Sequence, residues 1–308
     1  MKVKSIEVIG LGASTVDIIS LVDHFPKGKE VQEVIAMVVQ GGGPVSTAMV
    51  TLSRLGAKSG MIDTIGDDWR GMLIREEFQR EGVDIDYVEV SQGCVSATSC
   101  IMVTRSDGVR AIMFSPGSVK ELSLTNTHRT AIESAKYLHV SGRHWEACMQ
   151  AVRFARAAGV QVSFDGGADR YRSILRELVP LTDVCIVARD FAEKYTGVQE
   201  LPKAAELIEK CGPKLVVITD GNRGSYIHSR EGQTFYQPAY IFHEVVDTTG
   251  CGDSYHGAFL FGLLRGYGLE KTASLASATA ALNSQRLGGR SGLPNLKEVE
   301  TFLLGARP

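Results

Sequence analysis

Residues 246–259 read VDTTGCGDSYHGAF, and this stretch sets the expected fold and chemistry of the chain. Gly250, Cys251 and Gly252 are small residues placed just before an apolar run, 258–264, that has the character of a helix. Small residues leave main-chain N–H groups accessible at a helix N-terminus, so the stretch predicts a site for a negatively charged group. Asp253 follows in the same turn. Its carboxylate either accepts a proton from a hydroxyl that attacks the bound anion or caps the helix, and the stretch alone leaves both readings open.

The composition is that of an ordinary soluble globular protein. The 308 residues are 44% hydrophobic and 22% charged, which is enough for a large core. A net charge of -2 offers no basic field for nucleic acid. No stretch approaches the roughly 20 apolar residues of a membrane span, and we expect neither a signal segment nor a membrane partner. The expected partners are therefore small molecules.

The six cysteines are scattered singly, without a Cys-x-x-Cys pair or nearby histidines at zinc-ligand spacing. This usage indicates a reduced, cytoplasmic setting in which most of the thiols pack in the core.

Strand-like and helix-like segments alternate along most of the chain, which predicts an α/β fold with a mostly parallel sheet. The expected strands are 5–11, 137–140, 160–164, 184–187 and 215–218, and the expected helices include 145–158, 203–210 and 270–285.

The first strand ends at a glycine pair, Gly10 and Gly12, but a third glycine at the spacing of a dinucleotide fingerprint is missing. Asp17 follows shortly afterwards. Ligands bind beyond the carboxyl ends of the strands in open α/β sheets, so Asp17 is either a ligand-binding carboxylate or a solvated turn residue.

Two segments depart from this alternation. Residues 18–39, with a turn at 26–29, and residues 95–114, with a turn at 106–108, each have the pattern of an antiparallel hairpin. They are either a lid over a ligand site or two surface hairpins.

Three further turns could contact ligands. Residues 40–56 form a glycine-rich turn followed by an amphipathic helix, and residues 219–224 read TDGNRG. Residues 141–145 read SGRHW, in which Arg143 could bind an anionic group or cap main-chain carbonyls.

These motifs together resemble those of the ribokinase-type (phosphofructokinase B) carbohydrate kinases. The family signature Asp-Thr-x-Gly-x-Gly-Asp matches residues 247–253, Gly41-Gly42 matches its first glycine motif, and Thr-x-Gly-x-x-Gly matches residues 219–224, all in family order. The resemblance implies a ribokinase-like α/β fold: a Rossmann-like, mostly parallel sheet flanked by helices, with a small β-sheet lid. It implies one kinase domain, 1–308, with a core of 1–15, 40–93 and 116–308 and a lid of 16–39 and 94–115.

The resemblance also implies roles for individual residues. The catalytic group would be the base Asp253 with an anion hole at Gly250, Cys251 and Gly252. The sugar would be bound by Asp17, Gly41, Gly42, Ser46 and Arg143. The nucleotide would be bound by Thr219, Gly221, Gly224 and Asn283, and a monovalent cation by Asp247, Thr249 and Gly288. The expected cofactors are ATP and Mg²⁺, with K⁺ as a further candidate, and the expected assembly is a homodimer formed through the lid.

Two positions depart from the family pattern. Ser46 stands where many members have Asn, which removes an amide that could bind sugar hydroxyls. Residues 188–191 read ARDF where most members have Asn-x-x-Glu near Mg²⁺, leaving Asp190 and Glu193 as substitutes.

These departures, together with Arg143 and the loop GGRSG at 288–292, look most similar to the sulfofructose kinase branch. The predicted substrate is thus a ketose with an anionic group at C6, such as 6-sulfofructose, phosphorylated at the C1 hydroxyl. Fructose or a 2-keto-3-deoxy sugar acid is the alternative substrate, and a non-catalytic sugar or nucleotide sensor is the alternative function.

Overall fold

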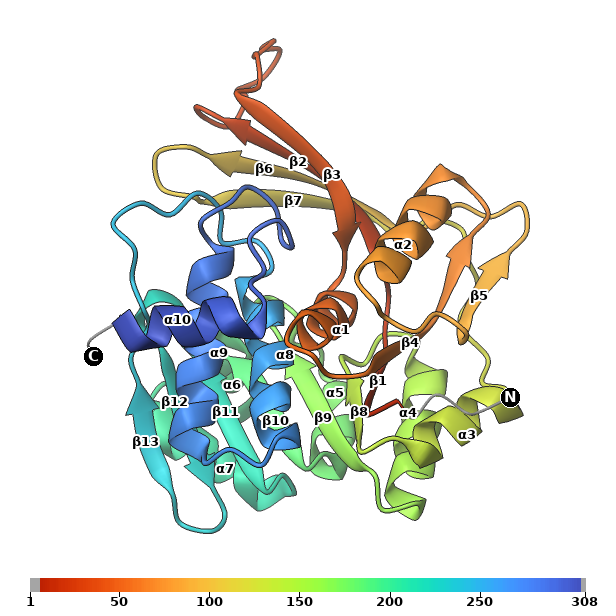
Figure 1. Ribbon diagram of the computed structural model, residues 1–308, viewed down its shortest axis with the longest axis vertical. Helices are drawn as coiled ribbons and strands as arrows, with labels where there is room; N and C mark the ends of the chain where they lie inside the picture. The colour runs from red at the N-terminus through yellow and green to blue at the C-terminus, as the bar shows by residue number, and fades with distance from the viewer. Residues whose placement is uncertain (1–5, 306–308) are drawn as a thin grey trace.

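A computed structural model describes residues 6–305; Ser5, which was expected to begin the first strand, lies outside this range. A nine-stranded sheet forms the centre of the larger part of the molecule (Figure 1). Its strands are, in spatial order, β13 (Thr234–Gln237), β12 (Ser225–Ser229), β11 (Leu215–Thr219), β10 (Val184–Ala188), β9 (Gln161–Gly166), β8 (Tyr137–Val140), β1 (Val8–Leu11), β4 (Ser59–Gly66) and β5 (Val88–Ser91). The strands from β11 to β5 are parallel, and β12 and β13 add an antiparallel edge. The expected mostly parallel sheet is confirmed.

Helices cover both faces of this sheet, because its strands are apolar on both sides. In β1, Val8 points into one core while Ile9 and Leu11 point into the other. One core is covered by α3 (Asn126–Ser134), α4 (Trp145–Ala157), α5 (Leu175–Leu178), α6 (Arg189–Thr196) and α7 (Leu201–Cys211), with a 3₁₀ turn, η1 (Val179–Leu181). The other is covered by α1 (Pro44–Arg54), α2 (Trp69–Arg80), α8 (Cys251–Leu264), α9 (Leu269–Asn283) and α10 (Leu296–Gly305).

Helix α8 lies deep in the second layer. Its residues from Ser254 to Gly262 are all buried, and it packs against α1 and α9. A helix that is apolar on all sides is stable only inside a protein core. Its N-terminus is thereby held at the edge of the sheet where the parallel strands end.

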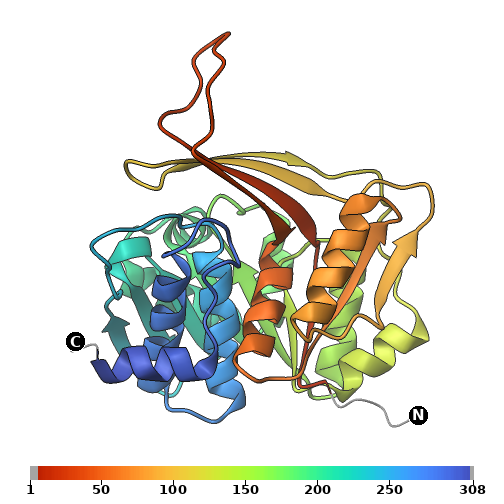
Figure 2. The same cartoon turned by 45° about the horizontal axis from the view of Figure 1, so that its top comes forward.

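A separate four-stranded sheet lies over that edge (Figure 2). Its strands are, in spatial order, β3 (Ala36–Gly42), β2 (Thr15–Val22), β6 (Thr98–Thr104) and β7 (Arg110–Ser115). β2–β3 and β6–β7 are antiparallel pairs, as the two hairpin patterns predicted, while β2 and β6 are parallel.

The turn predicted at 26–29 lies within a longer connection, 23–35, because β2 ends and β3 begins further from it than predicted. This segment is rich in charged residues and contains Pro26, and Val31 is fully exposed. Longer strands here would therefore bury little apolar surface. Within residues 6–305, no helix is long and apolar enough to cross a membrane. All six cysteines are free thiols.

Candidate active site

A cavity of about 890 Å³ lies between the small sheet and the carboxyl ends of the large-sheet strands. The small sheet contributes Asp17, Ser99 and Phe114 to its lining, and the large sheet contributes the segments that follow β9 and β11. The first turn of α8, including Gly250 to Asp253, completes the wall. Ligand sites of open α/β proteins occupy this edge, so the cavity is the candidate active site.

The first turn of α8 has the features of an anion site. Gly250 precedes the helix with φ 70°, a left-handed conformation that favours glycine, and no side chain of the described residues caps the helix. The space beside Gly252 is open, so a ligand can approach its main chain closely. Asp253 is the third residue of α8 and does not cap it. Of the two readings of Asp253, the structure therefore removes the capping one.

The electrostatics of Asp253 depend on Arg170, which the sequence analysis did not identify. Arg170 Nη1 lies 3.6 Å from a carboxylate oxygen of Asp253 and 3.6 Å from one of Asp165. Desolvation raises the pKa of Asp253, whose side chain is 18% exposed, and the charge of Arg170 partly offsets this rise. Arg170 lies in the loop after β9, which contains no recognisable motif. The only feature of the sequence that pointed to Arg170 was its place just after a parallel strand, at the edge of the sheet where ligands bind.

Asp17 faces the same cavity from β2. Its side chain is buried, accepts a hydrogen bond from Thr15 Oγ1 at 2.7 Å, and has a raised pKa because of desolvation. A side chain at Gly42 would collide with the Asp17 carboxylate. Glycine at position 42 is thus explained by the close approach of Asp17.

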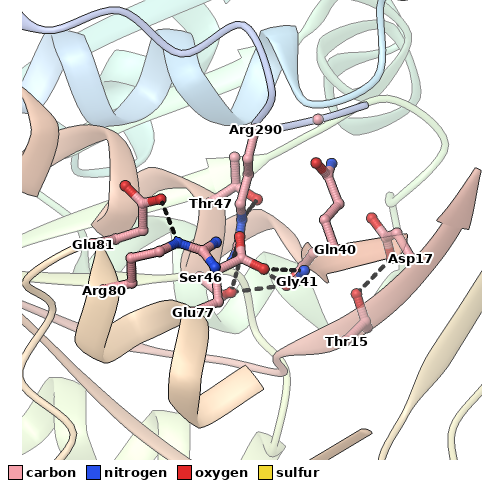
Figure 3. A network of polar contacts seen from close by, with 12 residues as sticks. Thr15, Asp17, Gln40, Gly41, Ser46, Thr47, Glu77, Arg80, Glu81 and Arg290 are labelled. Carbon is pink, nitrogen blue, oxygen red and sulfur yellow. Dashed lines mark hydrogen bonds and ion pairs between the residues drawn. The ribbon is translucent and has the colours of Figure 1, made fainter. Parts of the chain in front are cut away.

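Gly41 and Ser46, two other expected sugar contacts, lie behind the cavity wall in a polar network around Arg290 (Figure 3). Ser46 is fully buried; its hydroxyl donates to the Gly42 carbonyl at 2.8 Å and accepts from Arg290. Arg290 also donates to the Gly42 carbonyl at 3.0 Å and pairs with Glu77 at 3.2 Å, and Glu77 accepts from the Gly41 N–H. These contacts use the only donor of the Ser46 hydroxyl, and Ser46 is not among the described residues that line the cavity.

Arg143 lies beside the cavity. Of the described residues, the lining includes Phe114 but not Arg143, whose guanidinium is 5.8 Å from the centre of the Phe114 ring. The next residue, His144, adopts φ 50° and its ring contacts Asp63 at 3.2 Å and Glu121 at 3.1 Å. His144 therefore fixes the loop that carries Arg143.

The far end of the cavity contains the expected nucleotide turn. Thr219, Gly221 and Gly224 all contribute to its lining. Apolar side chains line the same end, namely Tyr240, Ile241, Phe242, Ala280 and Ala281. Asn283 is fully buried and donates to the Gly289 carbonyl at 2.9 Å, so it holds the neighbouring loop and does not line the cavity.

The three expected cation ligands are close together. Asp247 accepts from the Thr249 N–H at 2.7 Å and from the Gly288 N–H at 2.8 Å. Within residues 6–305, the buried Thr249 hydroxyl has no hydrogen-bond partner, as a free ligand atom would require.

The suggested substitutes for the family's magnesium residues are engaged elsewhere. Glu193 pairs with Arg189 at 2.9 Å, and Asp190 accepts from the Asp169 N–H at 2.9 Å and pairs with Lys194 at 3.3 Å. Neither belongs to the cavity lining formed by the described residues. We therefore assign no magnesium role to either side chain.

A buried polar cluster lies directly behind the candidate base. The sequence did not predict that these residues lie together. It consists of Asp165, His139 and His256, all less than 5% exposed. Burial lowers the pKa of His139 to about 3 and also lowers the pKa of His256. Both rings are consequently neutral near pH 7.

The two sheets, the cavity between them and the carboxylate-bearing helix N-terminus define an α/β enzyme of the ribokinase-like class. The chain belongs to the pfkB family of carbohydrate kinases, whose model matches residues 4–296. It is thus a phosphotransferase with an alcohol group as acceptor.

Individual relatives extend over almost the whole chain. A nucleoside kinase of Methanothermobacter thermautotrophicus is 28% identical, with 95% of this chain and 94% of the relative covered. A 5-dehydro-2-deoxygluconokinase of Shouchella clausii is 27% identical, with 97% and 96% covered. The crystal structure of a ribokinase from Thermotoga maritima matches with a TM-score of 0.83 at 26% identity, covering 97% of this chain and 99% of that one. These relatives differ in the substrates that their names give.

Proposed function

We propose that this protein transfers the γ-phosphoryl group of ATP to a primary hydroxyl of a sugar, with Asp253 as the general base. The observation that carries the proposal is the position of Asp253. It lies at an uncapped helix N-terminus and in one cavity with both Asp17 and the 219–224 turn. A base between a sugar site and a phosphate site is what phosphoryl transfer to an alcohol requires.

In the proposed reaction, Asp17 accepts hydrogen bonds from sugar hydroxyls and orients the sugar beneath the small sheet. The reacting hydroxyl gives its proton to the Asp253 carboxylate while its oxygen forms a bond to the γ-phosphorus. The bond from that phosphorus to the bridging oxygen of ADP breaks. The main-chain N–H groups at Gly250, Cys251 and Gly252, together with Arg170, stabilise negative charge on the transferring group.

The apolar end of the cavity, with Tyr240 and Phe242, is suited to the adenine base, and Thr219, Gly221 and Gly224 would lie along the phosphates. Mg²⁺ would neutralise charge on the triphosphate oxygens when bound with ATP. The free Thr249 hydroxyl and the Asp247 carboxylate fit a monovalent cation such as K⁺, which would hold the loop at Gly288 against the anion site.

For the substrate, we propose an anionic ketose of the 6-sulfofructose type, phosphorylated at C1. Two arginines line the cavity, Arg110 from the small sheet and Arg170 beside the base, and Arg143 stands next to Phe114. Guanidinium groups at a sugar site favour an anionic substituent. The 5-dehydro-2-deoxygluconokinase relatives support the competing proposal, a sugar acid.

A substrate panel tests this proposal. ADP release would be measured with fructose, 6-sulfofructose, 5-dehydro-2-deoxygluconate and ribose, for the wild type and for Arg143→Ala. We expect the highest kcat/KM with 6-sulfofructose and a loss of about tenfold or more in Arg143→Ala for anionic sugars alone. A preference for the neutral sugars, or indifference to Arg143, would remove the anionic ketose. ADP release with none of the four sugars would show that the acceptor is a different alcohol.

A further inference from the structure

His139, Asp165 and His256 form a compact cluster of potential metal ligands behind the catalytic turn. One ligand atom from each of the three side chains lies within 4.8 Å of the other two. His139 and Asp165 lie on the neighbouring parallel strands β8 and β9, where His139 is the register partner of Ser163. Asp165 is two residues beyond Ser163 and so points to the same face of the sheet. His256, one turn after Asp253 in α8, covers that face.

All three side chains have an unused polar atom. Within the described part of the chain, His139 Nε2, Asp165 Oδ2 and His256 Nδ1 are buried and have no hydrogen-bond partner. Buried polar atoms are nearly always paired, so three unpaired atoms in one cluster point to a binding site. The other oxygen of Asp165 accepts from the Gly167 N–H at 2.9 Å and lies 3.7 Å from His256 Nε2.

The remaining contacts orient the cluster as the surroundings of a metal site do. His139 Nδ1 lies 3.1 Å from Ser163 Oγ, which turns Nε2 toward the centre of the cluster. Metal-bound histidines usually have such a partner on their second ring nitrogen. Asp165 and His256 also line the active-site cavity, which gives an ion a path inward.

We propose that His139, Asp165 and His256 bind one divalent transition-metal ion of the Zn²⁺ class. Two imidazoles and a carboxylate are borderline ligands that suit Zn²⁺, Co²⁺ or Ni²⁺, whereas Mg²⁺ prefers oxygen ligands and retains its water. The side chains must close toward the ion, because zinc–ligand distances are about 2.0–2.2 Å. Solvent in the cavity supplies the remaining coordination.

An ion at this position would act on the catalytic turn through Asp165. Arg170 contacts both Asp165 and Asp253 at 3.6 Å. A metal ion bound to Asp165 would neutralise the negative charge of its carboxylate. Arg170 would then pair with Asp253 alone. The site is separate from the magnesium that accompanies ATP, and its existence does not depend on which sugar is phosphorylated.

The test uses Co²⁺ as a spectroscopic probe. The full-length protein would be stripped with a chelator and titrated with Co²⁺ while visible absorption is recorded. We expect one Co²⁺ per chain with the bands of a four- or five-coordinate site, displaced by one equivalent of Zn²⁺ and unaffected by excess Mg²⁺. Asp165→Asn and His256→Gln should each weaken Co²⁺ binding by roughly 100-fold, and Ser163→Ala by about tenfold.

His128→Gln is the matched control, because His128 is as buried as His256 and lies on α3, outside the cluster; it should bind Co²⁺ like the wild type. Should the cluster variants fail to fold, NMR of Co²⁺-loaded wild type decides, since two bound imidazoles give two hyperfine-shifted N–H signals. The absence of a stoichiometric Co²⁺ site would overturn the proposal and leave a buried water as the occupant. Unchanged binding in folded Asp165→Asn and His256→Gln would overturn it as well.

Discussion

At the scale of single residues, the chemistry depends on how the protein controls one carboxylate. Asp253 is desolvated, which raises its pKa, and Arg170 opposes that rise. A general base works best when its pKa approaches the working pH while it stays ionised. Asp253 is therefore a stronger base than an ordinary aspartate. The neighbouring Arg170 supplies a positive charge that also stabilises the transferring phosphoryl group.

This balance predicts the pH dependence of the reaction. A base with a raised pKa loses activity on acidification at a higher pH than an ordinary aspartate, whose pKa is about 3.9. Arg170→Gln removes a charge that lowers the pKa of Asp253, so the acid limb of kcat/KM should move to higher pH. The measurement is kcat/KM against pH for both proteins. An acid limb that stays in place, or moves to lower pH, would contradict this role of Arg170.

Sequence motifs predicted the part of the site that lies in one local stretch, and did not predict the part that depends on contacts between distant segments. The sequence around Gly250 and Asp253 is local, so a single stretch specifies the turn, the helix and the carboxylate. Arg170 and Arg290 reach their partners through contacts between segments far apart in the chain. No periodicity or spacing encodes such contacts. For the same reason the sequence could not show that Ser46 is paired with Arg290.

At the scale of elements, the Arg290 network connects β3, α1 and α2 to the loop before α10. The Arg290 and Glu77 side chains are 3% and 6% exposed, and the pair also bonds to main-chain groups of Gly41 and Gly42. It thereby holds the point where the small sheet joins the core. Removing one partner leaves a charge buried without compensation.

We expect Arg290→Met to lower the free energy of unfolding by about 3–5 kcal/mol. Combining it with Glu77→Gln should recover a large part of that loss, since no buried charge remains. Arg80→Met is the control, because the Arg80 side chain is 69% exposed, and should change stability by less than about 0.5 kcal/mol. Urea unfolding of the four proteins provides the comparison. A double variant as unstable as Arg290→Met would show that packing, and not the charge pair, holds this junction.

Element boundaries were predictable where hydrophobic pattern and turn residues agreed. The strand Tyr137–Val140 has the predicted bounds, and the helix at 145–158 ends one residue earlier than expected. The connection 23–35 was not predictable, because Val31, Val34 and Ile35 continue a strand-like pattern although they are exposed. Local pattern cannot tell a paired strand from an extended loop.

At the scale of the whole molecule, the small sheet has two unlike faces. The inner face contributes Asp17, Ser99, Ile112 and Phe114 to the cavity. On the outer face, strand register aligns Val39, Ile18, Cys100 and Met113 in one row across all four strands. Val39 is 45% and Met113 is 59% exposed. An apolar row of this kind suits the expected homodimer through the lid.

We expect the wild type to sediment as a dimer and Val39→Asp to sediment as a monomer, because the new charge would be desolvated in the interface. Met72→Asp is the control, since Met72 is 58% exposed on α2, outside the row, and should leave the dimer intact. Sedimentation velocity at micromolar concentration measures all three. A monomeric wild type, or a dimer that survives Val39→Asp, would place the interface elsewhere or exclude it.

The most direct test of the kinase mechanism is a single-turnover measurement of ADP formation with an accepted sugar, comparing the wild type with Asp253→Asn. The substitution keeps the shape of the side chain and removes its ability to accept the proton. If Asp253 is the base, the rate of the chemical step falls by about 10²–10⁴-fold, while the affinity for ATP changes little. A rate for Asp253→Asn within tenfold of the wild type would contradict the assignment of Asp253 as the group that activates the sugar hydroxyl.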